Sequence, residues 1–180
     1  MQTAYIALGS NLASWVGPPG ATLAAAVKRL SHLGHIAAQS SLYSTAPVGF
    51  ADQPRFVNAV VALQTSLQPH DLLNKLLVIE KEYGRDRTIG IPNGPRTLDL
   101  DILLVGDLEL NEPELELPHP RLIERAFVLV PLREIAPQLR IAGRGKTVSE
   151  LLQTLENCQK GETNAVARME SDGWRASAHS

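Results

Sequence analysis

Apolar and polar residues follow two different periods along the chain, and these periods predict a mixture of strands and helices. Strand patterns cover residues 3–8, 36–44, 56–63 and 98–105. Apolar residues recur at helical spacing over 21–33, and a second helix is expected to begin near Pro69 and to end at Gly84. The order βαββαβ is that of a ferredoxin-like core, so the predicted fold class is α+β.

The C-terminal part of the chain is predicted to extend this core. Two more helical patterns occupy residues 123–135 and 148–155, and from Gly161 onward most residues are small and polar. A length of 180 residues suggests a single domain. We therefore expect one domain over 1–158 and a polar, mobile tail over 159–180.

Segments rich in proline and glycine predict two long loops, at 45–54 and 84–95. Loops of this length are unusual in a compact domain and tend to bind ligands or to act as lids. The turn Gly9-Ser10-Asn11, after the first strand, is also suited to offering backbone N–H groups to an anion. The functional site is expected to lie among these segments.

The stretch GPRTLDLDILLVG, residues 94–106, contains two carboxylates beside an apolar run. In a strand Asp99 and Asp101 point to the same face, with Cα atoms roughly 6.6 Å apart. Two such charges repel when they are partly buried, and a shared cation removes that cost. Oxygen ligands favour Mg²⁺, Mn²⁺ or Ca²⁺, and Mg²⁺ typically combines one or two carboxylates with substrate phosphates. The alternative is a solvated strand edge.

Three arginines, Arg85, Arg87 and Arg96, lie in the segment that leads into the aspartate pair. Guanidinium groups suit phosphate oxygens, so this segment is a candidate triphosphate site. The alternative is that the arginines pair with nearby aspartates, which is most realistic for Arg87. His119, between two prolines in LPHPR, is a candidate phosphate donor or general acid.

Other positions suggest a planar ligand and a buried charge. Phe56 and Asn58 share a strand face, which would suit an aromatic heterocycle, and Phe127 is a second candidate. Plain core packing is the alternative for both phenylalanines. Glu80 falls on the apolar face of its predicted helix, where a carboxylate needs a partner. It either pairs with an arginine or serves a binding site.

Composition excludes several classes of function. The formal net charge is −2, so no general basic field attracts nucleic acid or an anionic membrane. No apolar run approaches the ~18 residues of a membrane span, and the N-terminus lacks a secretory signal pattern. With Cys158 as the single cysteine, no disulfide forms within the chain. We expect a cytoplasmic monomer that binds neither nucleic acid nor membrane.

Five motifs together resemble the 6-hydroxymethyl-7,8-dihydropterin pyrophosphokinase family of folate biosynthesis. They are YIALGSNL, YSTAPVG…DQPRFVNAVVAL, IEKEYGR, GPRTLDLDILL and LPHPRLIERAFVLVPLREIAP, and they span about residues 4–155. The resemblance implies transfer of pyrophosphate from ATP to the pterin hydroxymethyl group, with release of AMP. It also implies two Mg²⁺ ions between the triphosphate and the pair Asp99 and Asp101.

The resemblance assigns roles to individual residues. Implied catalytic residues are Asp99, Asp101, Arg85, Arg96 and His119. Implied nucleotide contacts are Arg85, Arg96, Ile102, His119, Arg125 and Glu80, with Arg121 as a further ATP contact. Implied pterin contacts are Thr45, Val48, Phe56, Asn58, Phe127 and Asp99. Three flexible active-site loops are implied at 9–12, 45–54 and 84–95.

One departure from the family pattern falls in the third loop. Asn93 stands before GPR, where the family usually has tryptophan, so closure of the site would use Ile89 or Ile91 or be looser. Two other functions are possible for such a sequence. One is a nucleotidyl transferase using Gly9-Ser10 and the aspartate pair, although nearly the whole domain separates these features. The other is a non-catalytic ferredoxin-like module that binds RNA, against which the charge argues.

Overall fold

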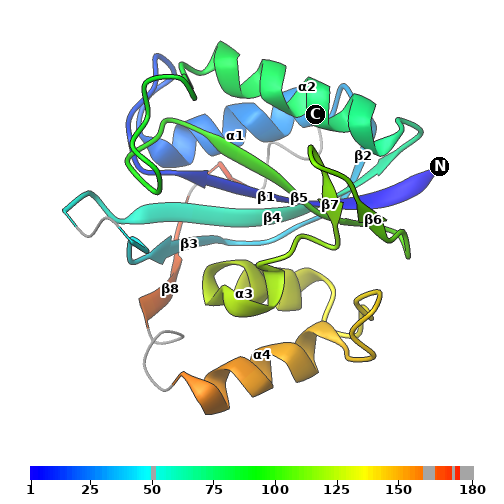
Figure 1. The fold of residues 1–180 in the computed structure, drawn as a ribbon. Coiled ribbons are helices and arrows are strands. Elements are labelled where there is room, and N and C mark those ends of the chain that lie inside the picture. Colours follow the sequence, from blue (N-terminus) through cyan, green and yellow to red (C-terminus); the bar gives the residue numbers. More distant parts are fainter. Residues whose placement is uncertain (50–51, 160–164, 172, 175–180) are drawn as a thin grey trace.

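The computed structural model describes residues 1–49, 52–159, 165–171 and 173–174. Its centre is an antiparallel sheet that runs across the molecule (Figure 1). The strands lie in the order β5 (Asp99–Val105), β1 (Gln2–Ser10), β4 (Phe56–Thr65), β3 (Leu42–Thr45) and β8 (Val166–Met169). A further strand, β2 (His35–Gln39), pairs with the second half of β4.

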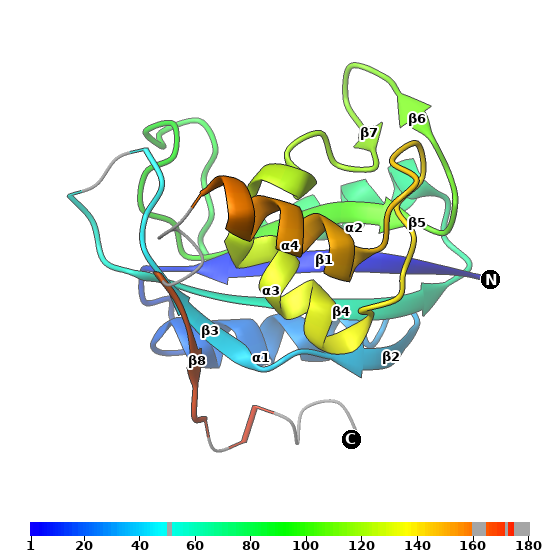
Figure 2. The same cartoon turned by 90° about the horizontal axis from the view of Figure 1, so that it is seen from below.

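Helices cover both faces of this sheet. The first face carries α1 (Pro19–Leu30) and α2 (Pro69–Glu82). On the opposite face, α3 (Ala126–Ile135) lies against the sheet and α4 (Val148–Cys158) lies beyond it (Figures 1 and 2). A short 3-10 helix, η1 (Leu122–Glu124), precedes α3, and a small hairpin is formed by β6 (Leu110–Asn111) and β7 (Glu116–Leu117).

The predicted α+β, ferredoxin-like core is confirmed. Successive side chains of a strand point to opposite faces of the sheet, so its apolar residues can pack on both faces. In β1, Ile6 and Leu8 pack towards α1 and α2, whereas Tyr5 and Ala7 belong to the apolar cluster under α3 and α4. β1 is therefore apolar on both sides, as a strand between two helical layers requires.

The single strand predicted over 36–44 is two strands. β2 pairs with the far half of β4, β3 pairs with its near half, and Ser40 and Ser41 lie at the break. At this break the Ser40 hydroxyl accepts a hydrogen bond from the Val60 N–H at 2.9 Å, and the Ser40 N–H donates to the Val60 carbonyl at 2.9 Å. Ser40 therefore provides hydrogen-bond partners for the N–H and carbonyl of Val60 in β4, where the ladder of strand pairing is interrupted.

The helices begin and end close to the predicted positions. In α2, Pro69 occupies the first turn, and Gly84, with φ +86°, follows its C-terminus in a left-handed conformation that glycine accepts readily. The helix predicted to begin at 123 begins at Ala126, because Leu122–Glu124 forms the separate 3-10 turn. A reciprocal capping box of Thr147 and Glu150 starts α4.

The described part of the C-terminal segment differs from the predicted polar, mobile tail. Val166–Met169 forms β8 along the edge of β3, and the side chain of Trp174 is 3% exposed. The periodicity of so short a segment carries little signal, because its order depends on pairing with β3 and on contacts such as that of Trp174 with Ser40. The division into one domain and a tail remains a prediction. Within the described residues, no helix has the length and apolarity to cross a membrane.

Candidate active site

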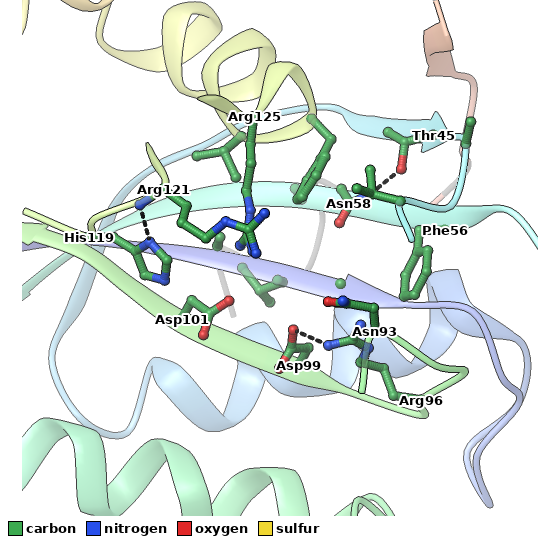
Figure 3. Close-up of a pocket in the computed structure, with 18 of the residues that line it drawn as sticks. Thr45, Phe56, Asn58, Asn93, Arg96, Asp99, Asp101, His119, Arg121 and Arg125 are labelled. Atoms are coloured by element: carbon green, nitrogen blue, oxygen red, sulfur yellow. Dashed lines mark hydrogen bonds and ion pairs between the residues drawn. The ribbon is translucent and has the colours of Figure 1, made fainter. Parts of the chain in front are cut away.

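A cavity of about 260 Å³ opens at the end of the sheet where β1, β4 and β5 meet the loops. Asp99 and Asp101 of β5 lie on one wall, with Arg121 and Arg125 facing them across the cavity (Figure 3). Phe56, Asn58 and Thr45 lie at the other end (Figure 3). The cavity therefore has a charged half and an aromatic, amide-bearing half.

The aspartate pair faces the cavity because of the register of β5. Leu100 and Ile102 are buried towards α1 and α2, so the alternate residues Asp99 and Asp101 point to the opposite side. A register shift opposite Tyr5 and Ile6 then places both Leu103 and Leu104 in the cluster under α3. The buried residues on both faces hold the start of β5 rigidly in place beneath the two carboxylates.

The surroundings of Asp101 disfavour the charged form of its carboxyl group. Burial and, next, the charge of Asp99 raise the pKa of Asp101 to about 7, and Arg125 opposes this shift. Among the described residues, no cluster of three or more Asp, Glu, His or Cys side chains is placed to bind a metal. A donor set of two carboxylates open to a cavity fits Mg²⁺, which completes its shell with water and substrate phosphate oxygens.

Two arginines connect the acids to the aromatic half. A terminal nitrogen of Arg96 is 3.0 Å from an oxygen of Asp99, and its guanidinium carbon lies 5.3 Å from the centre of the Phe56 ring. The guanidinium carbon of Arg125 similarly lies 5.5 Å from the centre of the Phe127 ring. Each cation is thereby held at the boundary of the two halves, where it is able to meet an anionic group.

Glu80 is buried beneath the site and is part of an ion pair, one of the two possibilities that the sequence left open. Arg87 donates to both carboxylate oxygens at 2.9 Å, and the Leu100 N–H donates to one of them at 2.9 Å. Burial raises the pKa of Glu80, while the Leu100 hydrogen bond lowers it. Arg87 also approaches Asp99 at 3.6 Å, so Glu80 links α2, the third loop and β5.

Arg85 and Ile102 do not line the cavity. Ile102 is 4% exposed and packs in the core on the opposite face of the sheet, so its predicted nucleotide contact can involve only its main chain. Arg85 has a buried Nε that finds no hydrogen-bond partner among the residues that the structure describes. Burial lowers its pKa and the charge of Asp99 opposes that shift, which places Arg85 within electrostatic reach of the pair.

His119 presents a hydrogen-bond donor to the cavity. The Arg121 N–H donates to its Nδ1 at 3.2 Å, so in the neutral ring the proton resides on Nε2. Burial, followed by the charges of Arg125 and Arg121, lowers the pKa of His119 to about 4. The ring is therefore neutral at pH 7, which suits hydrogen bonding to phosphate rather than a role as a charged acid.

The His119 ring is expected to titrate near pH 4 in the ligand-free, metal-free protein. An NMR titration of its ring signals checks this. Because the folded-state pKa lies below the unfolded value, the contribution of His119 to the free energy of unfolding should fall as pH drops from about 6.5 to 4. The contribution of Asp101, whose pKa is raised, has the opposite sign over this range. A His119 midpoint above 6 would contradict the neutral donor.

The aromatic half has a rigid polar edge. The Asn58 amide nitrogen donates to the Thr45 hydroxyl at 2.5 Å, which leaves the amide oxygen facing Gly9. A Cβ at Gly9 would lie only 2.9 Å from this oxygen, so glycine is required there for the amide to keep its position. Val48, 58% exposed, lines the cavity from the following loop.

Asn11 joins the three loops around the cavity, a role that the sequence did not indicate. Its oxygen accepts from the Arg96 N–H at 2.8 Å, and its amide nitrogen donates to Gln53 Oε1 at 2.9 Å and to the Pro54 carbonyl at 3.0 Å. Its own N–H and that of Leu12 donate to the Arg96 carbonyl. The expectation that this turn offers free N–H groups to an anion is therefore wrong at Asn11.

The third loop reaches the cavity through Asn93. This residue lines the cavity with a φ of +58°, a left-handed conformation that asparagine adopts more readily than bulkier residues, and its carbonyl accepts from Gln53 Nε2 at 2.8 Å. Ile89 and Ile91 are 82% and 61% exposed and do not line the cavity. Neither isoleucine covers the site in this arrangement of the loops.

Residues 5–137 match the family model of 7,8-dihydro-6-hydroxymethylpterin-pyrophosphokinase (HPPK). The chain belongs to this family. The HPPK of Pseudomonas aeruginosa, named 2-amino-4-hydroxy-6-hydroxymethyldihydropteridine pyrophosphokinase, is 49% identical over 154 residues, which cover 84% of this chain and 91% of that protein. The enzyme of the same name from Bacillus subtilis is 45% identical over 138 residues, covering 76% and 79% of the two chains.

Solved HPPK structures share the fold of this chain. The HPPK-DHPS of Plasmodium falciparum, solved with pterin and p-hydroxybenzoate, superposes with a TM-score of 0.74 at 17% identity. The match covers 94% of this chain but 47% of the Plasmodium chain, so this protein spans about half of that length. Membership of the HPPK family confirms the resemblance drawn from the five motifs and the enzyme class, and it excludes the non-catalytic module.

Most of the predicted HPPK site residues converge on the one cavity. Those that line it are Thr45, Val48, Phe56, Asn58, Arg96, Asp99, Asp101, His119, Arg121, Arg125 and Phe127. Glu80, Arg85 and Ile102 do not line it, and the side chain of Ile102 packs on the opposite face of the sheet. These residues come from four stretches of the chain, 45–48, 56–58, 96–101 and 119–127. Their individual ligand contacts remain predictions.

Proposed function

We propose that this HPPK transfers pyrophosphate from Mg·ATP to the hydroxymethyl oxygen of 6-hydroxymethyl-7,8-dihydropterin, releasing AMP. The observation that carries the proposal is the two-part cavity, which joins an aromatic, amide-bearing end to a pair of carboxylates facing arginines. A pterin has a flat ring with a hydrogen-bonding edge, and ATP supplies a polyanion. One cavity with both kinds of lining suits the meeting of these two substrates.

The pterin would occupy the aromatic end. Phe56 and Phe127 line the cavity from β4 and α3, and aromatic faces suit stacking on a planar heterocycle. Asn58, held by Thr45, offers its amide to the ring edge. An amide whose orientation is already held by a hydrogen bond discriminates well between heterocycles, because a wrong edge leaves a buried polar group unpaired.

The triphosphate would occupy the charged end. Asp99 and Asp101 would hold Mg²⁺, for which we propose two ions. When bound, the metal neutralises charge on the phosphate oxygens and orients them. Arg96, Arg125 and the neutral His119, which line the cavity, would donate hydrogen bonds to the same oxygens. The proposal extends to Arg121, which lines the cavity, and to Arg85, whose charge interacts with that of Asp99.

The reaction is a substitution at the β-phosphorus. The hydroxymethyl oxygen forms a bond to that atom as the bond to the α–β bridging oxygen breaks, and negative charge accumulates on the departing AMP. The hydroxyl proton is released to water. Little covalent work falls to the protein, so fixed donors and cations supply most of the acceleration. Arg96 contributes to both halves, because its cation lies over Phe56 and beside Asp99.

A product assay with Mg·ATP and 6-hydroxymethyl-7,8-dihydropterin tests the proposed function. We expect AMP and the pterin pyrophosphate in equal amounts, dependent on both substrates and abolished by EDTA. Release of ADP would indicate transfer of a single phosphate. Free pyrophosphate with AMP attached to the pterin would indicate the nucleotidyl transferase, and either pattern would overturn the proposal. The expectations of a monomer and of a cytoplasmic location remain predictions.

A further inference from the structure

The C-terminal strand β8 lies outside the residues that match the HPPK family model, yet it borders the site. It pairs antiparallel with β3, with Thr45 opposite Val166 and Ser44 opposite Ala167. The other edge of β3 pairs with β4, where Thr45 is opposite Phe56. The strand β3 therefore lies between β8 and β4 (Figures 1 and 2). Thr45, at the end of β3, lines the aromatic end of the cavity.

The segment is anchored on both faces of the sheet. Val166 packs with the apolar cluster under α3, whereas Met169 and Trp174 join the cluster under α1 and α2. The indole N–H of Trp174 donates to the Ser40 carbonyl at 2.7 Å, and Gln39 Nε2 donates to the Trp174 carbonyl at 2.9 Å. These bonds secure the segment at the break between β2 and β3, where the sheet has no continuous ladder.

Arg55, the residue before Phe56, also holds this C-terminal segment. Its Nε donates to the Ser44 hydroxyl at 2.9 Å, and one terminal nitrogen donates to the Ser44 carbonyl at 3.2 Å and to the Ala165 carbonyl at 2.8 Å. One guanidinium group thus joins β3, the start of β4 and the beginning of the C-terminal strand. Its contacts lie outside the cavity, so it acts on the site only through its neighbours.

Without β8, β3 would be a four-residue edge strand held on one side. Short edge strands open locally at low cost, because half of their backbone groups already face water. Thr45 is the last residue of β3, and its hydroxyl holds the Asn58 amide. Opening of β3 would therefore release both the wall of the aromatic end and the group that orients its amide.

We propose that the C-terminal strand, anchored by Trp174 and Arg55, is a positioning element for the pterin end of the cavity. The inference rests on the proposed function and adds to it a substrate-selective role for residues outside the family match. The affinity for a ligand falls in proportion to the fraction of molecules whose site is ordered. If undocking leaves the pterin end ordered about a tenth of the time, the KM for pterin rises about tenfold.

The charged end should not share this effect. Asp99 and Asp101 are on β5, at the far side of β1 and β4 from β8, and His119 and Arg125 come from the segment around η1. None of these residues contacts β3 in the ladder that β8 completes. The KM for ATP and kcat at saturating pterin should therefore change less than about threefold.

The test compares three chains with the intact protein in the AMP assay. A chain that ends at Gln159 and the variant Arg55→Gln should raise the KM for pterin, while a control chain that ends at Trp174 keeps every described contact and should behave as the intact protein. An unchanged pterin KM in the shorter chain, or an equal rise in both KM values, overturns the inference alone. Absence of AMP from the intact chain overturns both proposals.

A second measurement separates positioning from a merely structural role. Coupling is reciprocal, so pterin bound with α,β-methylene-ATP should slow amide hydrogen exchange at Val166–Met169 in the intact chain. A tail that only adds stability would show the same exchange with α,β-methylene-ATP alone as with both ligands. Equal protection in those two states overturns the inference, and additional protection by the pterin supports it.

Discussion

Replacing Asp99 or Asp101 with Asn is expected to lower kcat by about 10³-fold or more, which corresponds to roughly 4 kcal/mol of lost transition-state stabilisation. The amide keeps the shape of each side chain but removes the charge that would hold Mg²⁺ against the triphosphate. Steady-state AMP formation at saturating Mg·ATP measures the loss. The matched control is Asp107→Asn, an exposed aspartate just beyond β5, which should retain normal activity.

The same substitution at Asp101 is expected to leave the fold intact or to stabilise it. The folded-state pKa of Asp101 is about 7, raised from 3.8, so ionising this group opposes folding, and the penalty grows as pH rises from about 4 to 7. Asn removes the penalty. Thermal unfolding at pH 8 in EDTA should therefore show an equal or higher Tm together with the loss of activity. Near-normal turnover in either variant would exclude the proposed metal site.

Replacing Glu80 with Ala is expected to lower the free energy of unfolding by about 2–4 kcal/mol. The substitution leaves the Leu100 N–H buried without its acceptor and removes the partner of Arg87. The Arg87 side chain is 51% exposed and can turn to water, so most of the cost comes from the backbone group and the space left behind. Urea unfolding at pH 7 measures the difference.

The control for Glu80 lies two residues further along the same helix. Glu82 also pairs with an arginine, Arg29 at 2.7 Å, but the two side chains are 37% and 39% exposed. An exposed pair contributes little, so Glu82→Ala should cost no more than about 1 kcal/mol. If both substitutions lowered the free energy of unfolding equally, burial would not be the reason for the contribution of Glu80 to stability.

Local periodicity accounts for what could be predicted about the fold. The strand period placed Asp99 and Asp101 on one face and Leu100 and Ile102 on the other, and the structure confirms this division. Pro69 and Gly84 marked the ends of α2 for similarly local reasons, because their backbone preferences do not depend on distant partners. The break at Ser40 was not predictable in this way, since it depends on pairing with β4.

The features of the site that could not be predicted are hydrogen bonds and ion pairs between residues far apart in the chain. Glu80 was seen to need a partner, but two possibilities stood until the third loop was placed over α2 and Arg87 reached it. Asn11 is an ordinary polar residue in sequence, and its bonds to Gln53 and Arg96 exist only because three loops meet. Such bonds carry no periodic signal, because each residue involved is compatible with a solvated loop.

The sequence by itself determined the order of the core elements, the face that carries the acid pair and, through its five motifs, the family. These features depend on neighbouring residues, whose spacing is set by the backbone. The tertiary structure alone decided that Arg87 neutralises Glu80, that Asn11 joins the loops, and that the C-terminal strand completes the sheet edge beside Thr45. Each of these contacts forms between segments that only folding brings together, so its free energy has no counterpart in the local pattern.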